Sequence, residues 1–272
     1  MNDQPKFEFD SIEVAESYDA GLVPFLFVPW AEALAEQHGP WESLSVLDLA
    51  AGTGVLSRRL GPRTGAQGLV VSADINAEML KVAERNCQDS AGNHQFVCCS
   101  AESLICDDNS FDVVLCQQGF QFFPDKTAAA KEVNRVLKPG GKAIISTWLP
   151  VERCAYFVTI CLTLEHIGEH WLSEKLRVPF DHMPREGLYA SFRSAGFMHV
   201  EVTEYEKVFE LPGGLDQAMS FIYSTPIAED LRSFSPEQRE YFEQEVAKRL
   251  EALEAPPNKF GMMSINELKA IV

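Results

Sequence analysis

The chain has 272 residues, 46% of them hydrophobic and 23% charged, which is ordinary for a globular protein of one large or two modest domains. Intrinsic disorder, a collagen-like repeat and a small disulfide scaffold are excluded as descriptions of the whole chain. Acidic residues outnumber basic ones by 40 to 23, for a formal net charge of −17. Since nucleic acid and anionic lipid attract basic surfaces, we expect neither nucleic acid nor a membrane as a partner.

The sequence contains no segment typical of a secretion signal or a membrane span. Its most apolar run, residues 21–35, is interrupted by two prolines and a glutamate and is shorter than the ~20 residues that a spanning helix needs. The seven cysteines are odd in number and form no Cys-x-x-Cys pair. We therefore expect reduced thiols, a cytoplasmic location and no metal site.

The first half of the chain predicts helices followed by an α/β pattern. Residues 7–40 are predicted to be mainly helical, with an aromatic and proline-rich middle. Between residues 44 and 148, five short apolar runs alternate with helical stretches, which is typical of a parallel sheet with crossover helices. The predicted fold class is therefore α/β, a doubly wound, Rossmann-like domain. The expected strands are 45–49, 68–73, 95–99, 111–116 and 142–147.

Capping and turn residues predict where the helices between these strands begin and end. Asn76 is placed to cap a helix over 77–86, and another helix is expected over 124–137. The Gly-Pro pair at 61–62 is expected to end the helix that begins after Gly54.

The rest of the chain has a different pattern. Apolar residues recur at helical spacing over 156–171, and a second helix is predicted over 186–194. An alternating strand is expected over 200–205, with residues 207–211 as its candidate partner. A Ser-Pro-Glu-Gln capping box predicts a helix over 235–253.

The loop after the first expected strand carries the most informative residues. Its small residues, Gly52 and Gly54, let a ligand approach the backbone at the start of a helix. A dinucleotide-binding loop needs a third glycine where Ser57 stands, and Asp48 suits a cation better than a pyrophosphate. Asp74 ends the second expected strand, where an acid accepts hydrogen bonds from both hydroxyls of a ribose. An unphosphorylated nucleoside with a cationic amino-acid arm fits these features, and S-adenosylmethionine is such a molecule.

At these residues the chain resembles the class I S-adenosylmethionine-dependent methyltransferases, most of all the small-molecule type that includes ubiquinone- and menaquinone-biosynthesis enzymes. The family's first motif, Leu-Asp-Leu-Gly-Cys-Gly-Thr-Gly, is matched by Leu47–Gly54 with Ala-Ala in place of Gly-Cys. The family's second-strand acid is matched by Asp74. The further matches are Ser100–Ile105, Asp108–Val114 and Leu137–Gly141.

The resemblance implies a seven-stranded, mostly parallel sheet with a helical lid. Residues 1–40 are then expected to form an N-terminal helical lid segment, and residues 41–150 the S-adenosylmethionine-binding core. Residues 151–195 are expected to form a helical insertion over the acceptor site, and residues 196–272 the strands and helices that complete the sheet.

Twelve residues are predicted to bind the cofactor. Gln117, after the fourth strand, is assigned to the methionine arm. The resemblance adds Tyr18, for which packing within a helix face is the alternative, and the Ser100-Ala101 pair at the adenine. The family commonly has Asp at the position of Ser100. The Ser100 hydroxyl can accept only a weaker, neutral hydrogen bond. The full set is Tyr18, Asp48, Ala50, Gly52, Gly54, Asp74, Ile75, Met79, Ser100, Ala101, Glu102 and Gln117.

The segment 116–123 follows the fourth strand, where the methyl group should meet its acceptor. It lacks the Asn/Asp-Pro-Pro-Tyr/Phe motif of enzymes that methylate nucleic-acid bases, so we expect a small-molecule acceptor. Substrate-binding residues are expected at Gln118, Phe120 and Phe122, with a structural turn and core aromatics as the alternative.

No catalytic residue is assigned from the sequence. His166 and His182, in the helical insertion, are the candidates for a general base, and a structural or exposed position is the alternative for each. A base is needed only if the acceptor is protonated at the working pH.

The expected function is transfer of a methyl group to O, N or C of a small, apolar or aromatic metabolite by in-line displacement, with S-adenosylhomocysteine as the leaving product. The alternatives are an enzyme of the same fold that promotes decarboxylation or cyclisation, a nicotinamide-dependent oxidoreductase, and a role in modifying macromolecules. The chain is expected to be a monomer or a homodimer.

Overall fold

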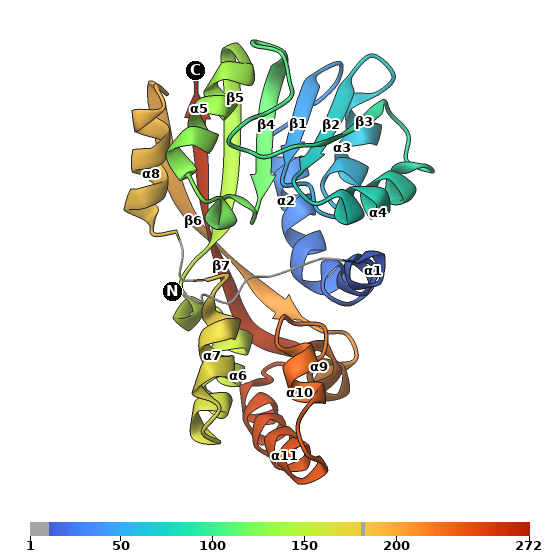
Figure 1. Cartoon of the computed structure of the whole chain (residues 1–272), viewed down its shortest axis with the longest axis vertical. Helices are drawn as coiled ribbons and strands as arrows, with labels where there is room; N and C mark the ends of the chain where they lie inside the picture. The colour runs from blue at the N-terminus through green and yellow to red at the C-terminus, as the bar shows by residue number, and fades with distance from the viewer. Residues whose placement is uncertain (1–10, 181–182) are drawn as a thin grey trace.

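The computed structural model describes residues 11–180 and 183–272. Its centre is a seven-stranded sheet in the order β3-β2-β1-β4-β5-β7-β6, with helices on both faces (Figure 1). β7 is antiparallel to its neighbours β5 and β6, and the other pairs are parallel. The strands are β1 Ser45–Leu49, β2 Leu69–Asp74, β3 His94–Cys98, β4 Phe111–Gln117, β5 Leu137–Trp148, β6 His199–Glu210 and β7 Lys259–Ile271.

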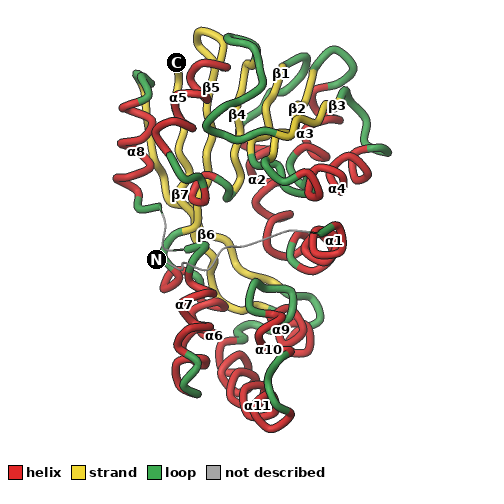
Figure 2. The backbone as a smooth tube through the Cα atoms, viewed as in Figure 1, coloured by secondary structure: helices red, strands yellow, loops and turns green. Residues whose placement is uncertain are grey.

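The helices form three groups, which Figure 2 separates from the strands by colour. The N-terminal group is α1 Ile12–Gly21, the π-helix η1 Val23–Phe27 and α2 Val28–Gln37. The group on the upper part of the sheet is α3 Ser57–Thr64, α4 Ala77–Cys87, η2 Phe120–Phe122, α5 Lys126–Val136 and α8 Arg185–Ser194. The group in the lower half is η3 Val151–Arg153, α6 Ala155–His166, α7 His170–Arg177, α9 Gly214–Ile222, α10 Ala228–Arg232 and α11 Pro236–Leu253.

The five strands predicted in the parallel part of the sheet and two predicted helix caps are confirmed. Val46 and Leu47 of β1 are completely buried, because helices cover both faces of a parallel sheet and leave its strands almost wholly apolar. Asn76 caps α4, and Ser235 forms the capping box of α11.

β6 and β7 connect the two halves of the molecule. They are 12 and 13 residues long and continue past the carboxyl end of β5 into the lower half (Figure 1). There they join a second apolar core that includes Tyr156, Phe209 and Phe260. The predicted strand at 200–205 is confirmed as part of β6. The suggested partner at 207–211 is wrong, because residues 199–210 form one continuous strand whose partner is β7.

The apolar residues at 156–171, expected at the spacing of one helix, belong to two helices. Gly168, with φ of +89°, ends α6, and α7 begins two residues later. Trp171, the last of these residues, is 53% exposed because the new helix presents it to solvent.

The Gly-Pro pair predicted to end α3 lies inside it. Pro62 has no amide hydrogen to give to the carbonyl of Arg58, one helical turn earlier. The Ser90 hydroxyl donates to that carbonyl at 3.1 Å instead. At Gly61 a Cβ would lie 2.3 Å from the His94 ring, so this glycine lets α3 pack closely on the chain before β3.

Within residues 11–180 and 183–272, no helix combines the length and the apolar character needed to cross a membrane. All seven cysteines lie in these residues and carry free thiols.

Candidate active site

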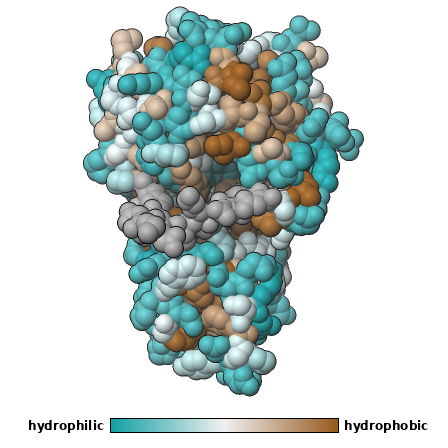
Figure 3. Space-filling model, in the orientation of Figure 1, coloured by the Kyte–Doolittle hydropathy of each residue, from teal (hydrophilic) through white to brown (hydrophobic). Residues whose placement is uncertain are grey.

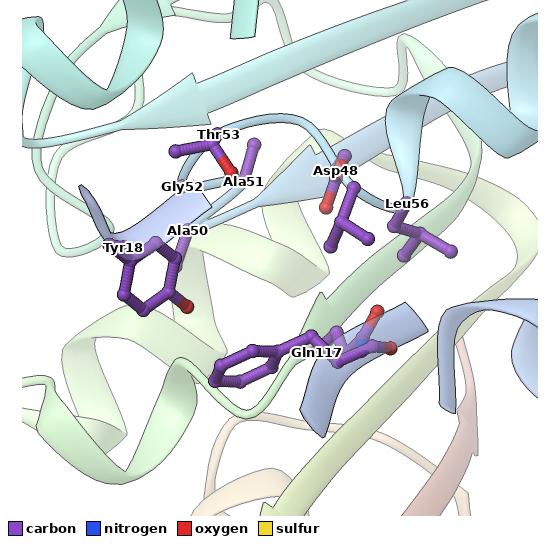
Figure 4. Close-up of a pocket in the computed structure, with 10 residues that line it drawn as sticks. Tyr18, Asp48, Ala50, Ala51, Gly52, Thr53, Leu56 and Gln117 are labelled. Carbon is purple, nitrogen blue, oxygen red and sulfur yellow. The ribbon is translucent and has the colours of Figure 1, made fainter. Parts of the chain in front are cut away.

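A pocket lies at the carboxyl end of β1, beside the N-terminal helices (Figure 4). It contains about 320 Å³ of space that no protein atom fills, part of which is open to solvent. The loop after β1 forms one wall, and residues of α1, η1 and β4 form the other. The lining residues are Tyr18, Phe27, Asp48, Ala50, Ala51, Gly52, Thr53, Val55, Leu56 and Gln117.

The loop between β1 and α3 turns sharply because three of its residues have a left-handed backbone. Their φ angles are +57° at Ala50, +54° at Gly52 and +79° at Gly54. At Gly54 a Cβ would lie 3.0 Å from the Cβ of Ala83 on α4, so glycine allows the loop to pack against that helix. At Gly52 a Cβ would meet no atom within 4 Å, so a ligand has room to approach the backbone.

Asp74, the last residue of β2, holds this loop in place. Its Oδ2 accepts the N–H of Gly52 at 2.8 Å, and its Oδ1 accepts the N–H of Asn76 at 2.8 Å. Burial raises the pKa of Asp74, and these two hydrogen bonds act in the opposite direction. Each carboxylate oxygen has a further lone pair, so the side chain can still accept a ribose hydroxyl.

Asp48 is buried in β1 and bound to the start of α3. Its Oδ2 accepts the backbone N–H and the hydroxyl of Ser57 at 3.0 and 2.6 Å, and the Ser57 hydroxyl is 2.7 Å from that of Ser72. Burial raises the pKa of Asp48 to about 7, although the Ser57 hydrogen bonds lower it. Ser57, which stands out in the sequence only as a missing glycine, therefore orients Asp48.

The N-terminal helices close the pocket opposite the loop. The rings of Tyr18 and Phe27 have centroids 5.5 Å apart. Burial raises the pKa of Tyr18, and the carboxylates of Asp74 and Asp19 raise it further. Gln117 donates from Nε2 to the carbonyl oxygen of Phe27 at 2.9 Å, which ties the end of β4 to η1.

Two buried polar atoms of the pocket have no hydrogen-bond partner among the described residues. They are the hydroxyl oxygen of Thr53 and Oε1 of Gln117, and leaving such atoms unpaired costs free energy. Together with Asp48 they offer a carboxyl group, an amide oxygen and a hydroxyl to a ligand that carries an ammonium and a carboxylate. The chemistry of these residues fits the amino-acid arm of S-adenosylmethionine. The assignment of Asp74, which lies beside the pocket lining, to the ribose stays a prediction.

Some lining residues are absent from the sequence prediction. Thr53 lies between the two motif glycines, and its hydroxyl was an available signal. Phe27 had no local signal, because its place in the pocket depends on the path of the π-helix η1. The full set is Phe27, Ala51, Thr53, Val55 and Leu56.

Seven predicted cofactor residues lie outside the pocket lining. Two of them, Gly54 and Asp74, shape and hold the loop beside the pocket, and the other five are Ile75, Met79, Ser100, Ala101 and Glu102. Ile75 is 73% exposed, whereas Met79 is buried where α1 packs on α4. Ala101 is also buried, and Ser100 donates its hydroxyl hydrogen to the carboxylate of Glu102. The role of these residues at the adenine stays a prediction.

The predicted acceptor residues lie in different environments. Gln118 is buried and Phe122 is 46% exposed. Phe120 is completely buried, with its ring centroid 5.3 Å from that of Phe192 on α8. The position of Phe120 fits the alternative of a core aromatic, because η2 directs this ring toward α8. A substrate wall at Phe120 and Phe122 stays a prediction.

The structure does not bring the candidate base His166 to the pocket. It lies at the end of α6, half exposed, with Nε2 3.8 Å from a carboxylate oxygen of Glu245 on α11. His182 lies outside the described residues. In the part of the chain that the structure describes, no group of three or more His, Cys, Asp or Glu is arranged to hold a metal ion.

Known proteins share the motif and much of the sequence. Residues 46–141 match the family model described as a methyltransferase domain. The chain is 34% identical over 189 residues to the ubiquinone/menaquinone biosynthesis C-methyltransferase UbiE of Shewanella sp. (strain ANA-3), an alignment that covers 64% of this chain and 74% of the relative. The protein of the same name from Shewanella baltica (strain OS155) is 33% identical over 189 residues, with the same coverage.

Solved structures share the fold. Phosphoethanolamine N-methyltransferase 2 of Haemonchus contortus, in complex with S-adenosyl-L-methionine, matches with a TM-score of 0.60 and 19% identity over 96% of this chain and 57% of that chain. The YcgJ protein of Bacillus subtilis matches with a TM-score of 0.55 and 19% identity over 89% and 97%. These matches confirm the predicted Rossmann-like fold. With the sequence identity to its relatives, they show that the chain is an enzyme of the class I S-adenosylmethionine-dependent methyltransferases, with S-adenosylmethionine as its cofactor.

Proposed function

We propose that the chain methylates a small, apolar or aromatic molecule at O, N or C, with carbon as the first atom to test. The choice of carbon rests on the relatives, which are named C-methyltransferases. S-adenosylmethionine supplies a methyl group already activated on a positively charged sulfur. The residues of the chain have to bind it, align the acceptor and exclude water.

The observation that carries the small-molecule proposal is the chemistry around the pocket. Of the described residues that line it, none is Lys or Arg, whereas a phosphate-rich substrate would be expected to meet basic side chains. The ring of Phe27 lies 6.2 Å from that of Trp148, so the pocket borders an aromatic cluster. The net charge of −17 disfavours a polyanionic substrate, and Figure 3 shows apolar patches between the hydrophilic residues of this face.

Polar residues in and beside the pocket have roles in this proposal. Asp48, Thr53 and Gln117 hold the amino-acid arm, and Asp74 accepts the ribose hydroxyls. Tyr18 and Phe27 cover the pocket and keep water from the methyl group. No side chain is assigned as a base, since an acceptor that is already ionised or electron-rich needs none.

The test uses purified protein with S-adenosylmethionine that carries a ¹³C-labelled methyl group. The acceptors are 1,4-naphthohydroquinone, 1-naphthol and 1-naphthylamine, and parallel reactions contain transfer RNA or cell protein. Mass spectrometry detects the transfer, and the ¹³C chemical shift distinguishes a methyl group on carbon from one on oxygen or nitrogen. Label in a small aromatic product supports the proposal. Label that enters only RNA or protein contradicts it, and cofactor binding without any transfer favours a non-methylating reaction.

A further inference from the structure

Buried polar side chains at the end of β4 and β5 carry several atoms that have no hydrogen-bond partner among the described residues. Gln118, Thr147 and Asn266 are 4%, 0% and 0% exposed. The two amide atoms of Gln118, the two of Asn266 and the hydroxyl oxygen of Thr147 are all unpaired within the described residues. Gln121 is 2% exposed; its Nε2 donates to the carbonyl of Pro179 at 2.9 Å, and its Oε1 is unpaired in the same part of the chain. Buried polar atoms are nearly always satisfied, so this concentration points to a ligand.

Strand register places these residues together. Thr147 of β5 and Asn266 of β7 are direct partners in an antiparallel pair, so their side chains share one face of the sheet with Cβ atoms about 4.5–5.5 Å apart. The backbone N–H of Gln118 donates to the carbonyl of Ser146 at 2.9 Å, which holds the end of β4 beside Thr147. Gln121 follows on η2, which packs on β5. We call Gln118, Gln121, Thr147 and Asn266 the strand-end polar cluster.

The segment after β4 separates this cluster from the cofactor pocket. Gln117 lines the pocket, and Gln118 is the next residue. At Gly119 a Cβ would lie 2.5 Å from the Cβ of Ala50, a residue of the pocket wall, so the segment lies directly against the cofactor loop. The cluster therefore lies next to the space assigned to the methionine arm, with the end of β4 between them.

The groups around the cluster are neutral or already paired. One pleat back along β5 and β7, Ile145 and Leu268 are completely buried in the core under α5 and α8. Across β7, the strand partner of Asn266 is Glu204, which lies 3.3 Å from Arg153 in an ion pair. On the other face of β7, Glu267 is 3.0 Å from His38. The cluster therefore offers amide and hydroxyl groups without an unpaired charge.

We propose that the strand-end polar cluster is the part of the methyl-acceptor site that determines specificity, and that it binds an uncharged hydroxyl or carbonyl group of the acceptor. An amide presents both a hydrogen-bond donor and an acceptor. These match a hydroxyl group, or a carbonyl group with a hydroxyl next to it. None of the four side chains titrates near neutral pH, so they orient the acceptor and transfer no proton. This inference rests on the proposed function, because it assigns the acceptor to that same site.

The test removes the polar atoms and keeps the shape, with Thr147→Val and Asn266→Leu. Protein saturated with S-adenosylhomocysteine is titrated with 1-naphthol, naphthalene and 1-naphthoate by equilibrium dialysis. We expect the wild type to prefer the uncharged phenol to naphthalene by about tenfold or more, and to bind the carboxylate no better than naphthalene. In each variant the preference for 1-naphthol should fall to near unity, while the affinity for S-adenosylhomocysteine is unchanged.

Thermal unfolding of the ligand-free protein gives a second readout. Removing unpaired buried polar atoms should raise the unfolding midpoint of both variants, whereas Thr163→Val should lower it. Thr163 is the matched control, because it is completely buried but donates its hydroxyl hydrogen to the carbonyl of Thr159 at 2.8 Å. Equal binding of the probes by the wild type, a preference kept by both variants, or lowered midpoints would overturn the assignment. Failure to bind S-adenosylhomocysteine at all would instead count against the proposed function.

Discussion

Asp48 should make cofactor binding depend on pH. In the ligand-free protein, burial raises the pKa of Asp48 to about 7, so the group is mostly protonated at pH 6. An ammonium placed in the same pocket favours the charged carboxylate and lowers that pKa. Binding therefore releases a proton from Asp48 below pH 7, and the affinity rises with pH until about 7 and then levels off.

The size of the effect follows from the two pKa values of the Asp48 carboxyl group. If the ligand returns Asp48 to the ordinary aspartate value of 3.8, binding releases about 0.9 proton at pH 6 and about 0.1 proton at pH 8. The dissociation constant should then be about tenfold weaker at pH 6 than at pH 8, or about 1.4 kcal/mol. Asp48→Asn keeps the size of the side chain and an acceptor for Ser57, but it does not titrate.

Calorimetric titration of S-adenosylhomocysteine in two buffers of different ionisation enthalpy measures the protons released. The comparison is made at pH 6 and pH 8 for the wild type and Asp48→Asn. Burial also raises the pKa of Asp74, but Asp74 is present in both proteins, so their difference isolates Asp48. The reasoning is refuted if the wild type releases no proton at pH 6, or if Asp48→Asn releases as many.

Three further predictions concern the loop, a buried pair and the cofactor. Gly119→Ala should destabilise the fold by about 1–3 kcal/mol, because the new methyl group would lie 2.5 Å from the Cβ of Ala50. Adding Ala50→Gly to that variant should recover most of this loss in urea unfolding. If the changes in unfolding free energy of the two single variants simply add in the double variant, the contact is contradicted. Replacing His38 with Ala leaves Glu267, 7% exposed, without its hydrogen-bond partner at 3.0 Å and should cost about 1–3 kcal/mol. Glu267→Gln should restore part of this loss, and an unchanged unfolding free energy would show that the pair is not a stabilising contact. Asp74→Ala should weaken S-adenosylhomocysteine binding by about 1.5–3 kcal/mol for each ribose hydroxyl that it accepts, and an unchanged dissociation constant would place the ribose elsewhere.

The parts of the fold that could be predicted from the sequence are those with local causes. Buried parallel strands such as β1 are continuous apolar runs, and Asn76 and Ser235 cap helices through bonds to residues two or three positions away. In the pocket, Asp48 and Gly52 could be found because a tight ligand loop needs small residues and one acid at fixed spacing.

The parts that could not be predicted depend on contacts between distant segments. β7 alternates polar and apolar residues weakly, and its place between β5 and β6 is set by pairing across the sheet. Pro62 stays inside α3 only because Ser90, 28 positions away, satisfies the carbonyl that proline leaves free. Phe27 reaches the pocket through a π-helix, and Gln117 meets it across 90 positions.

The continuity of β6 and β7 restricts how the cofactor and the acceptor can enter. Both strands run unbroken through the two halves of the molecule. The halves therefore cannot separate unless hydrogen bonds between β6 and β7 break. The N-terminal helices are attached differently, since α1 contacts α4 through the Glu16–Arg85 ion pair at 2.6 Å and the Asp19–Asn86 hydrogen bond at 3.1 Å. Ala15 of α1 also packs on Met79 and Val82 of α4 in a small apolar cluster. Because this contact is small compared with the ladder between β6 and β7, we expect a ligand to enter by displacement of α1 and not by separation of the two halves.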